Sequence, residues 1–269
     1  MSTYPSAIGD LTGGFRRFVI GLGLAWLDLK LRYRRTLVGP FWLPLSSVVT
    51  IAVMGFIYGK LFKMNLAEYF PYLACGLALW SLISAFIADA HSVFVQSAHI
   101  AHQTPLPYSL YVLRRVANGF IQFAHTSVSF WAVAICFRVP FGVHTLMVLP
   151  ALAMLACFGF WITLGLGTVC LRFRDLAQII IVGTQLLFLA TPIFWKIDLL
   201  ADQRWLATCN PCFHLLEICR APLLGQPTPW ESWLAVLVIN VIGCTTRSPL
   251  SRHQRNSPAL RVGTRIPGP

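Results

Sequence analysis

Charge is scarce in this sequence. Lys, Arg, Asp and Glu make up 11% of its 269 residues, and only nine residues are acidic. Hydrophobic residues make up 57%, which leaves too little polar surface to cover a water-soluble domain of this size. The composition therefore excludes an ordinary soluble globular protein and predicts a chain that folds within a lipid bilayer.

Several functional motifs are also missing. Three residues rather than four separate Gly55 from Gly59, and Leu61 stands where a phosphate-binding loop needs Ser or Thr. The first fifteen residues lack the basic segment and apolar core of a cleavable signal peptide. The 21 Lys and Arg residues stand in short clusters without a continuous basic face, so we expect no nucleic-acid partner.

Long apolar runs dominate what is present. About 20 apolar residues are needed to cross the hydrocarbon core, and five runs come near that length or exceed it, whereas a sixth is short. The runs are Phe41 to Phe62, Tyr69 to Ala88, Val116 to Phe137, Leu146 to Leu171, Leu176 to Trp195 and Trp230 to Cys244. The sequence predicts an all-α integral membrane protein whose transmembrane domain, residues 41–244, has six helices. No Asp, Glu or Lys lies deep in these runs, which argues against an ion-coupled proton relay.

Residues 1–40 are predicted to be a cytoplasmic segment with an amphipathic helix at the membrane interface. The apolar stretch from Phe18 to Leu27 is too short to cross before Asp28 interrupts it. One helical face gathers apolar side chains, namely Phe15, Phe18, Val19, Leu22, Trp26, Leu29 and Tyr33. From Asp28 to Trp42 the chain passes directly from this basic helix into the first apolar run.

Positive charge predicts the orientation. Six spans place both termini on one side, and fifteen Lys and Arg residues fall on that side against six on the other. Lys and Arg are enriched in cytoplasmic loops. We therefore expect a multi-pass protein of the cytoplasmic (inner) membrane, with its N-terminus in the cytoplasm and its basic helix against membrane lipids.

Two large segments lie between the predicted spans. The cytoplasmic one, Asp89 to Arg115, is polar and is expected to form short surface helices broken by prolines. The outer one, Lys196 to Pro229, contains an apolar piece from Cys212 to Leu224 that is too short to cross. That piece predicts a re-entrant helical pair before the last span, shielded from lipid by protein.

The tail, residues 245–269, departs from this pattern. It contains five Arg and no acidic or aromatic residue, which is typical of a disordered basic cytoplasmic tail. The last apolar run also stops short of a full span at Cys244, where the composition changes abruptly. A second hypothesis is therefore that the native reading frame was lost near this residue.

Candidate ligands and nucleophiles are few. His99 and His102 form a single His-x-x-His with His91 upstream, and a membrane metalloenzyme would need further ligands, so we expect no metal. Cys209 and Cys212 form a Cys-x-x-Cys, which is either a redox pair or two structural thiols.

Two other polar groups stand in apolar surroundings. Asn118, Gln122 and His125 lie near one face of the third predicted span, where packing against a partner helix and a transport pathway are both open. Glu217 and Arg220 are spaced to pair with each other on a helix.

The chain resembles the integral-membrane permease subunits of ABC-type polysaccharide exporters, which move lipid-linked O antigen, capsule or teichoic acid. The resemblance runs from about Asp28 to Gly243. It is carried by Asp28-Leu-Lys-Leu-Arg-Tyr-Arg-Arg-Thr, Gly39-Pro-Phe-Trp, Tyr69-Phe-Pro-Tyr-Leu-Ala-Cys-Gly-Leu, Arg172-Phe-Arg-Asp-Leu, Thr191-Pro-Ile-Phe-Trp, Asn210-Pro211 and Leu215-Leu-Glu-Ile-Cys-Arg-Ala-Pro-Leu-Leu-Gly.

The resemblance implies a homodimeric permease with a separate ATP-binding subunit, which would bind the ATP and Mg²⁺ that this chain lacks motifs for. ATPase docking is expected at Gln96, His99, His102, Gln103, Pro105, Arg34 and Arg35. Gating is expected at Gly39 and Pro40, where the helix breaks. The aromatic residues Phe41, Trp42, Tyr69, Tyr72, Phe194 and Trp195 are either interfacial anchors or stacking contacts for sugar rings.

Two other functions stay open at this point. One is a drug or small-lipid exporter permease of the same superfamily. The other is a membrane-embedded transferase acting on a lipid-linked sugar, with His91 or His99 as its base.

Overall fold

The computed structural model describes residues 7–34, 39–94, 106–173 and 175–245, and these residues form helices and connecting loops without a strand. The α-helices are α1 (Ala7–Arg16), α2 (Phe18–Tyr33), α3 (Trp42–Leu61), α4 (Leu66–Ala88), α6 (Tyr108–Cys136), α7 (Val148–Arg172), α8 (Leu176–Ala190), α9 (Trp205–Thr208), α10 (Pro211–Leu223) and α11 (Trp230–Thr245). Short 3-10 helices are η1 (Gly39–Phe41), η2 (Asp89–Ser92), η3 (Val143–Met147) and η4 (Ile197–Gln203).

Four helical segments are long and apolar enough to cross a membrane: Trp42–Leu61, Leu66–Ser92, Tyr108–Cys136 and Val143–Arg172. They match the first four predicted spans. The fifth and sixth, α8 and α11, have 15 and 16 residues. At 1.5 Å per residue they extend about 22–24 Å, which is less than the roughly 30 Å of hydrocarbon.

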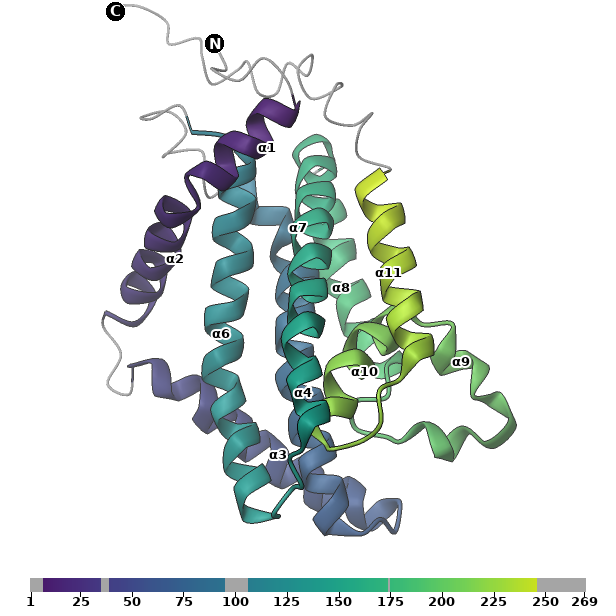
Figure 1. Ribbon diagram of the computed structural model, residues 1–269. Helices are drawn as coiled ribbons and strands as arrows, with labels where there is room; N and C mark the ends of the chain where they lie inside the picture. The colour runs from purple at the N-terminus through teal and green to yellow at the C-terminus, as the bar shows by residue number, and fades with distance from the viewer. Residues whose placement is uncertain (1–6, 35–38, 95–105, 174, 246–269) are drawn as a thin grey trace, which may run out of the picture.

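The bundle has two distinct ends (Figure 1). Helices α4, α6 and α7 run in alternating directions through its centre. At the α1 end, α4 and α7 finish and α6 begins. At the opposite end, α4 and α7 begin and α6 finishes, and α10 packs against the halves of α4 and α7 on that side. Residues 246–269 of the predicted tail lie outside the described residues.

The third predicted span was placed too late in the chain. Helix α6 begins at Tyr108 rather than Val116, so Arg114 and Arg115 lie within its second turn and not in a loop. The prediction ended the helix where hydropathy fell, but both arginines are paired with carboxylates inside the fold. The polar segment expected from Asp89 to Arg115 therefore stops at Pro107.

Phe86 of α4 lies at the centre of the bundle. Its ring contacts Gly119 of α6 on one side and Gly159 of α7 on the other, and a methyl group at either glycine would come within 2.7 Å of that ring. Thr163 donates a hydrogen bond of 3.1 Å to the Phe86 carbonyl. Small residues allow close helix approach in membranes, where association depends on packing.

Replacement of Gly159 tests this packing. Gly159→Leu is expected to lower the free energy of unfolding by about 1–3 kcal/mol, because the added side chain collides with Phe86. Gly183→Leu in α8 is the matched control, since no atom lies within 4 Å of the position of its first side-chain carbon. The measurement is thermal unfolding of the detergent-purified protein. Equal midpoints for the two variants would contradict this account of the core.

Candidate functional site

The N-terminal helices are attached to the start of α6. Asp10 of α1 accepts hydrogen bonds of 2.8 and 2.9 Å from the backbone N–H groups of Tyr108 and Ser109. The Ser109 hydroxyl donates to the Asp10 carbonyl at 2.6 Å. Pro107, which precedes the helix, contributes no side-chain cap. A carboxylate at a helix N-terminus satisfies free N–H groups and is favoured by the helix dipole, so Asp10 caps α6 from another helix.

Small residues allow α1 and α2 to lie close to α6. Gly14, Gly21 and Ala25 are buried, and the first two face Ser109 and Leu110. The large apolar side chains stay exposed: Phe15, Phe18, Val19, Leu22 and Trp26 on the predicted face, and also Ile20, Leu27 and Leu31. Two helices broken at Arg17 replace the single amphipathic helix expected, and α2 exposes apolar side chains around most of its circumference.

Asp28 joins α2 to α6 through charged and polar contacts. Its carboxylate accepts a hydrogen bond of 2.7 Å from Arg114 Nε, a second from Arg114 Nη2, and one of 2.9 Å from Asn118 Nδ2. The neighbouring Arg115 pairs with Asp89, which follows α4. Adjacent arginines of α6 therefore hold two other parts of the chain, and Asn118 has the packing role that the sequence left open.

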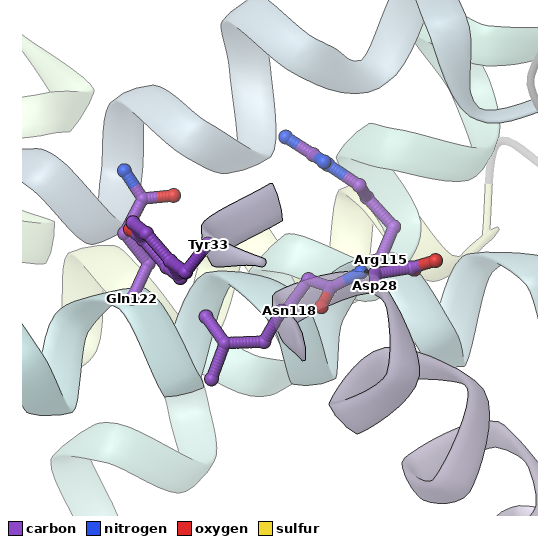
Figure 2. A pocket seen from close by; sticks show the side chains of 6 residues that line it. Asp28, Tyr33, Arg115, Asn118 and Gln122 are labelled. Carbon is purple, nitrogen blue, oxygen red and sulfur yellow. Dashed lines mark hydrogen bonds between the residues drawn. The ribbon is translucent and has the colours of Figure 1, made fainter. Parts of the chain in front are cut away.

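Beside this ion pair, a small hollow lies between α2 and α6 (Figure 2). The side chains that line it are Asp28, Leu29, Tyr33, Arg115, Asn118 and Gln122. It has room for about one water molecule. Gln122 thus lies at the contact between α2 and α6, and His125 bonds within its own helix, with Nδ1 2.7 Å from the Ile121 carbonyl.

The predicted gating residues lie where the described chain resumes after α2. Gly39 has φ +59°, a left-handed conformation that glycine adopts without steric cost, and Pro40 follows it in η1. Phe41 and Trp42, at the start of α3, are 72% and 60% exposed. Helix α2 ends at Tyr33 and α3 begins at Trp42, directly after η1, so the gating role of Gly39 and Pro40 stays a prediction. The two aromatic rings are free to meet lipid or another molecule.

Most of the predicted ATPase-docking residues cannot be placed. Gln96, His99, His102, Gln103, Pro105 and Arg35 lie outside the described residues. Arg34 is exposed in the turn after α2. Docking of an ATPase by these residues stays a prediction.

The other predicted aromatic residues gather at the opposite end. Tyr69 and Tyr72 of α4 are buried, and their hydroxyls bond to backbone carbonyls of residues 192–195. Phe194 and Trp195 are half-buried in that same segment. A sugar could stack on Tyr69 or Tyr72 only by displacing these contacts, whereas Phe41 and Trp42 carry no such restriction.

Arg220 of α10 is a buried cation that the sequence identified only as a partner of Glu217. That ion pair is present. Arg220 also donates a 2.6 Å hydrogen bond to the Pro192 carbonyl and lies 4.2 Å from the centre of the Tyr72 ring. The guanidinium therefore has a carboxylate, a carbonyl and an aromatic ring as neighbours.

The candidate residues for the alternative chemistries are only partly described, because His99 and His102 lie outside the described residues. No group of three or more His, Cys, Asp or Glu could hold a metal there. Cys212 is buried and Cys209 is exposed, and both thiols are free. His91 lies in η2, where its Nδ1 is 2.7 Å from the Ala88 carbonyl.

Comparison with known proteins identifies the family of this chain. The family model described as ABC-2 type transporter matches residues 22–224, which extend from α2 to the end of α10. The chain belongs to the ABC-2 type transporter family. It is therefore a multi-pass membrane subunit of a transporter rather than a catalytic enzyme.

Curated relatives of this transporter subunit match at modest identity over most of its length. Two O-antigen export system permease proteins RfbA from Klebsiella pneumoniae are 26% and 24% identical over 214 and 223 residues. These matches cover 79% and 80% of this chain and 82% and 86% of the relatives. An O-antigen export system permease protein RfbA from Myxococcus xanthus is 19% identical over 238 residues. That match covers 87% of this chain and 92% of the relative.

Substitution of Asp28 tests the attachment of α2. Asp28→Asn leaves Arg114 largely buried without its counter-charge, so the transporter subunit should lose about 1–3 kcal/mol of stability, between the values for exposed and buried pairs. Asp198→Asn is the matched control, because Asp198 and Arg204 form an exposed pair. Thermal unfolding in detergent measures both. A loss for Asp28→Asn no larger than for the control would show that this pair does not hold α2.

Proposed function

We propose that this chain is the membrane permease subunit of an ATP-driven exporter of a lipid-linked polysaccharide. The observation that carries the proposal is the similarity, over about four-fifths of the chain, to relatives that bear the name of O-antigen export permeases. The family assignment and the missing phosphate-binding loop support a division of labour in which a separate ABC subunit binds ATP and Mg²⁺.

The proposed assembly is a homodimer in the cytoplasmic membrane with six spans per chain. Helices α8 and α11 would be the fifth and sixth spans, and α10 part of a re-entrant pair. The α1 end would face the cytoplasm, which agrees with the excess of Lys and Arg predicted there. The exposed apolar side chains of α3 and α11 support contact with lipid or with a second chain.

The contacts of α1 and α2 support a route for motion from the ATPase to the channel. Asp10 and Asp28 hold both helices to α6, so a displacement of these helices would move α6 with them. Gly39 and Pro40 then provide the bend that leads into α3. Phe41 and Trp42, exposed beyond that bend, are the side chains best placed for sugar contact.

Two experiments test the export function: co-purification of the tagged protein with its partners, and deletion of its gene. An affinity-tagged chain is expected to co-purify with a nucleotide-binding subunit from its native host. Deletion of its gene should remove a polysaccharide from the cell surface while the lipid-linked polymer accumulates inside. Normal surface polysaccharide in the deletion strain would overturn the proposal. A drug exporter would instead change drug tolerance and leave the polymer in place.

The bend at Gly39 gives a second test. Gly39→Val should reduce export about tenfold, because a β-branched residue is strained by roughly 1–3 kcal/mol at positive φ. Gly23→Val is the matched control, since both positions have open space around them but Gly23 has an ordinary helical backbone. Surface polysaccharide per inserted protein is the measurement. Equal export by both variants would remove the gating role of Gly39.

A further inference from the structure

The chain leaves its helical path at the end of α8 while it is still buried. Residues 191–196 join α8 to η4, and Thr191, Pro192 and Ile193 are buried without being helical. Buried carbonyl groups need hydrogen-bond donors, all the more in a membrane where water is excluded. The carbonyls of Pro192, Phe194 and Trp195 accept hydrogen bonds from side chains of α4 and α10, whereas the Thr191 carbonyl accepts one from the Ile193 N–H group.

Three side chains supply these bonds. Tyr69 donates to the Phe194 carbonyl, and Arg220 donates to the Pro192 carbonyl at 2.6 Å. The Tyr72 hydroxyl lies 3.0 Å from the Pro192 carbonyl and 2.9 Å from the Trp195 carbonyl, so its single hydrogen serves one of them at a time. We call these three side chains and the carbonyls they bind the carbonyl latch.

The charge in the latch is balanced within one helix. Arg220 is 3% exposed and pairs with Glu217, one turn before it on α10. If α10 moved away from α4 and residues 191–196, Glu217 would move with Arg220. Separation would therefore break hydrogen bonds and the contact with the Tyr72 ring, but Arg220 would keep its counter-charge. Leaving a buried charge unpaired is the costly way to break an ion pair, and it is avoided here.

We propose that the carbonyl latch holds residues 191–196 and α10 against α4 in the resting protein and opens during transport. This inference rests on the proposed function, because it assumes a substrate that leaves at the end of the bundle opposite α1. Tyr72 and Arg220 are then positioning residues that keep this end closed between transport cycles.

Two native cysteines report on the latch. Cys75 lies one turn after Tyr72 on α4, Cys219 directly precedes Arg220, and both are buried. Cys209 is exposed in the same region and serves as an internal standard. Opening of the latch should make the two buried thiols accessible to a membrane-impermeant maleimide, with each labelled site identified by peptide mass spectrometry.

The first measurement compares variants of the purified full-length chain. Tyr72→Phe should raise the labelling rate of Cys75 and Cys219 about fivefold relative to Cys209, the factor expected for one hydrogen bond. Arg220→Gln should raise it further. Tyr58→Phe is the control, because its ring also contacts Phe194, at 5.2 Å, but its hydroxyl is not part of the latch. Unchanged labelling in both latch variants at an unchanged unfolding midpoint would overturn the latch.

The second measurement asks whether the latch opens during transport. In native cells, wild-type Cys219 should be labelled faster when ATP is present than after ATP depletion, whereas Cys209 should not change. Equal rates for Cys219 would overturn opening during transport. The first measurement needs neither ATP nor polysaccharide, and surface polysaccharide is scored separately, so failure of the latch is distinguishable from failure of the export function.

Discussion

A polar group buried in the hydrocarbon core of a bilayer needs a partner within the protein, because no water is present there to replace a missing hydrogen bond. The fold is arranged around that constraint. Asp28 and Arg114 pair between α2 and α6. Arg115 pairs with Asp89 after α4, and Arg220 finds a carboxylate and a carbonyl at the other end of the bundle. Apolar packing fills the space between these contacts, but it does not determine which polar groups pair with each other.

The two ends of the bundle meet this constraint differently. At the α1 end, carboxylates on α1 and α2 bind the N-terminal half of α6, so three helices are joined by charge and by helix capping. At the opposite end, tyrosine and arginine side chains bind the carbonyls of a non-helical segment. In the first arrangement the paired charges lie on different helices, whereas in the second both charges of the ion pair, Glu217 and Arg220, lie on α10.

Family membership and the contacts observed in this chain explain different properties. The ABC-2 match covers residues 22–224 and accounts for a transporter subunit without an ATP-binding motif. It leaves α11 outside, although α11 is held to α7 by hydrogen bonds from Trp161 to Asn240 and from Asn240 to the Met154 carbonyl. Asp10 also lies outside the match and yet caps a helix within it. The attachment of α1 is therefore a property of this chain that its own contacts establish.

Composition and hydropathy by themselves determined the helical membrane class, the first four spans, the break at Gly39 and Pro40, and the pairing of Glu217 with Arg220. These features depend on neighbours in sequence, through the length of an apolar run, the conformational freedom of glycine or the pitch of a helix. Only the tertiary structure decided that α6 begins at Tyr108, that Asp28 binds Arg114 and that Tyr72 is buried beneath Arg220. Each of these depends on groups brought together from distant parts of the chain. A local sequence pattern does not show which distant group a charged side chain will contact.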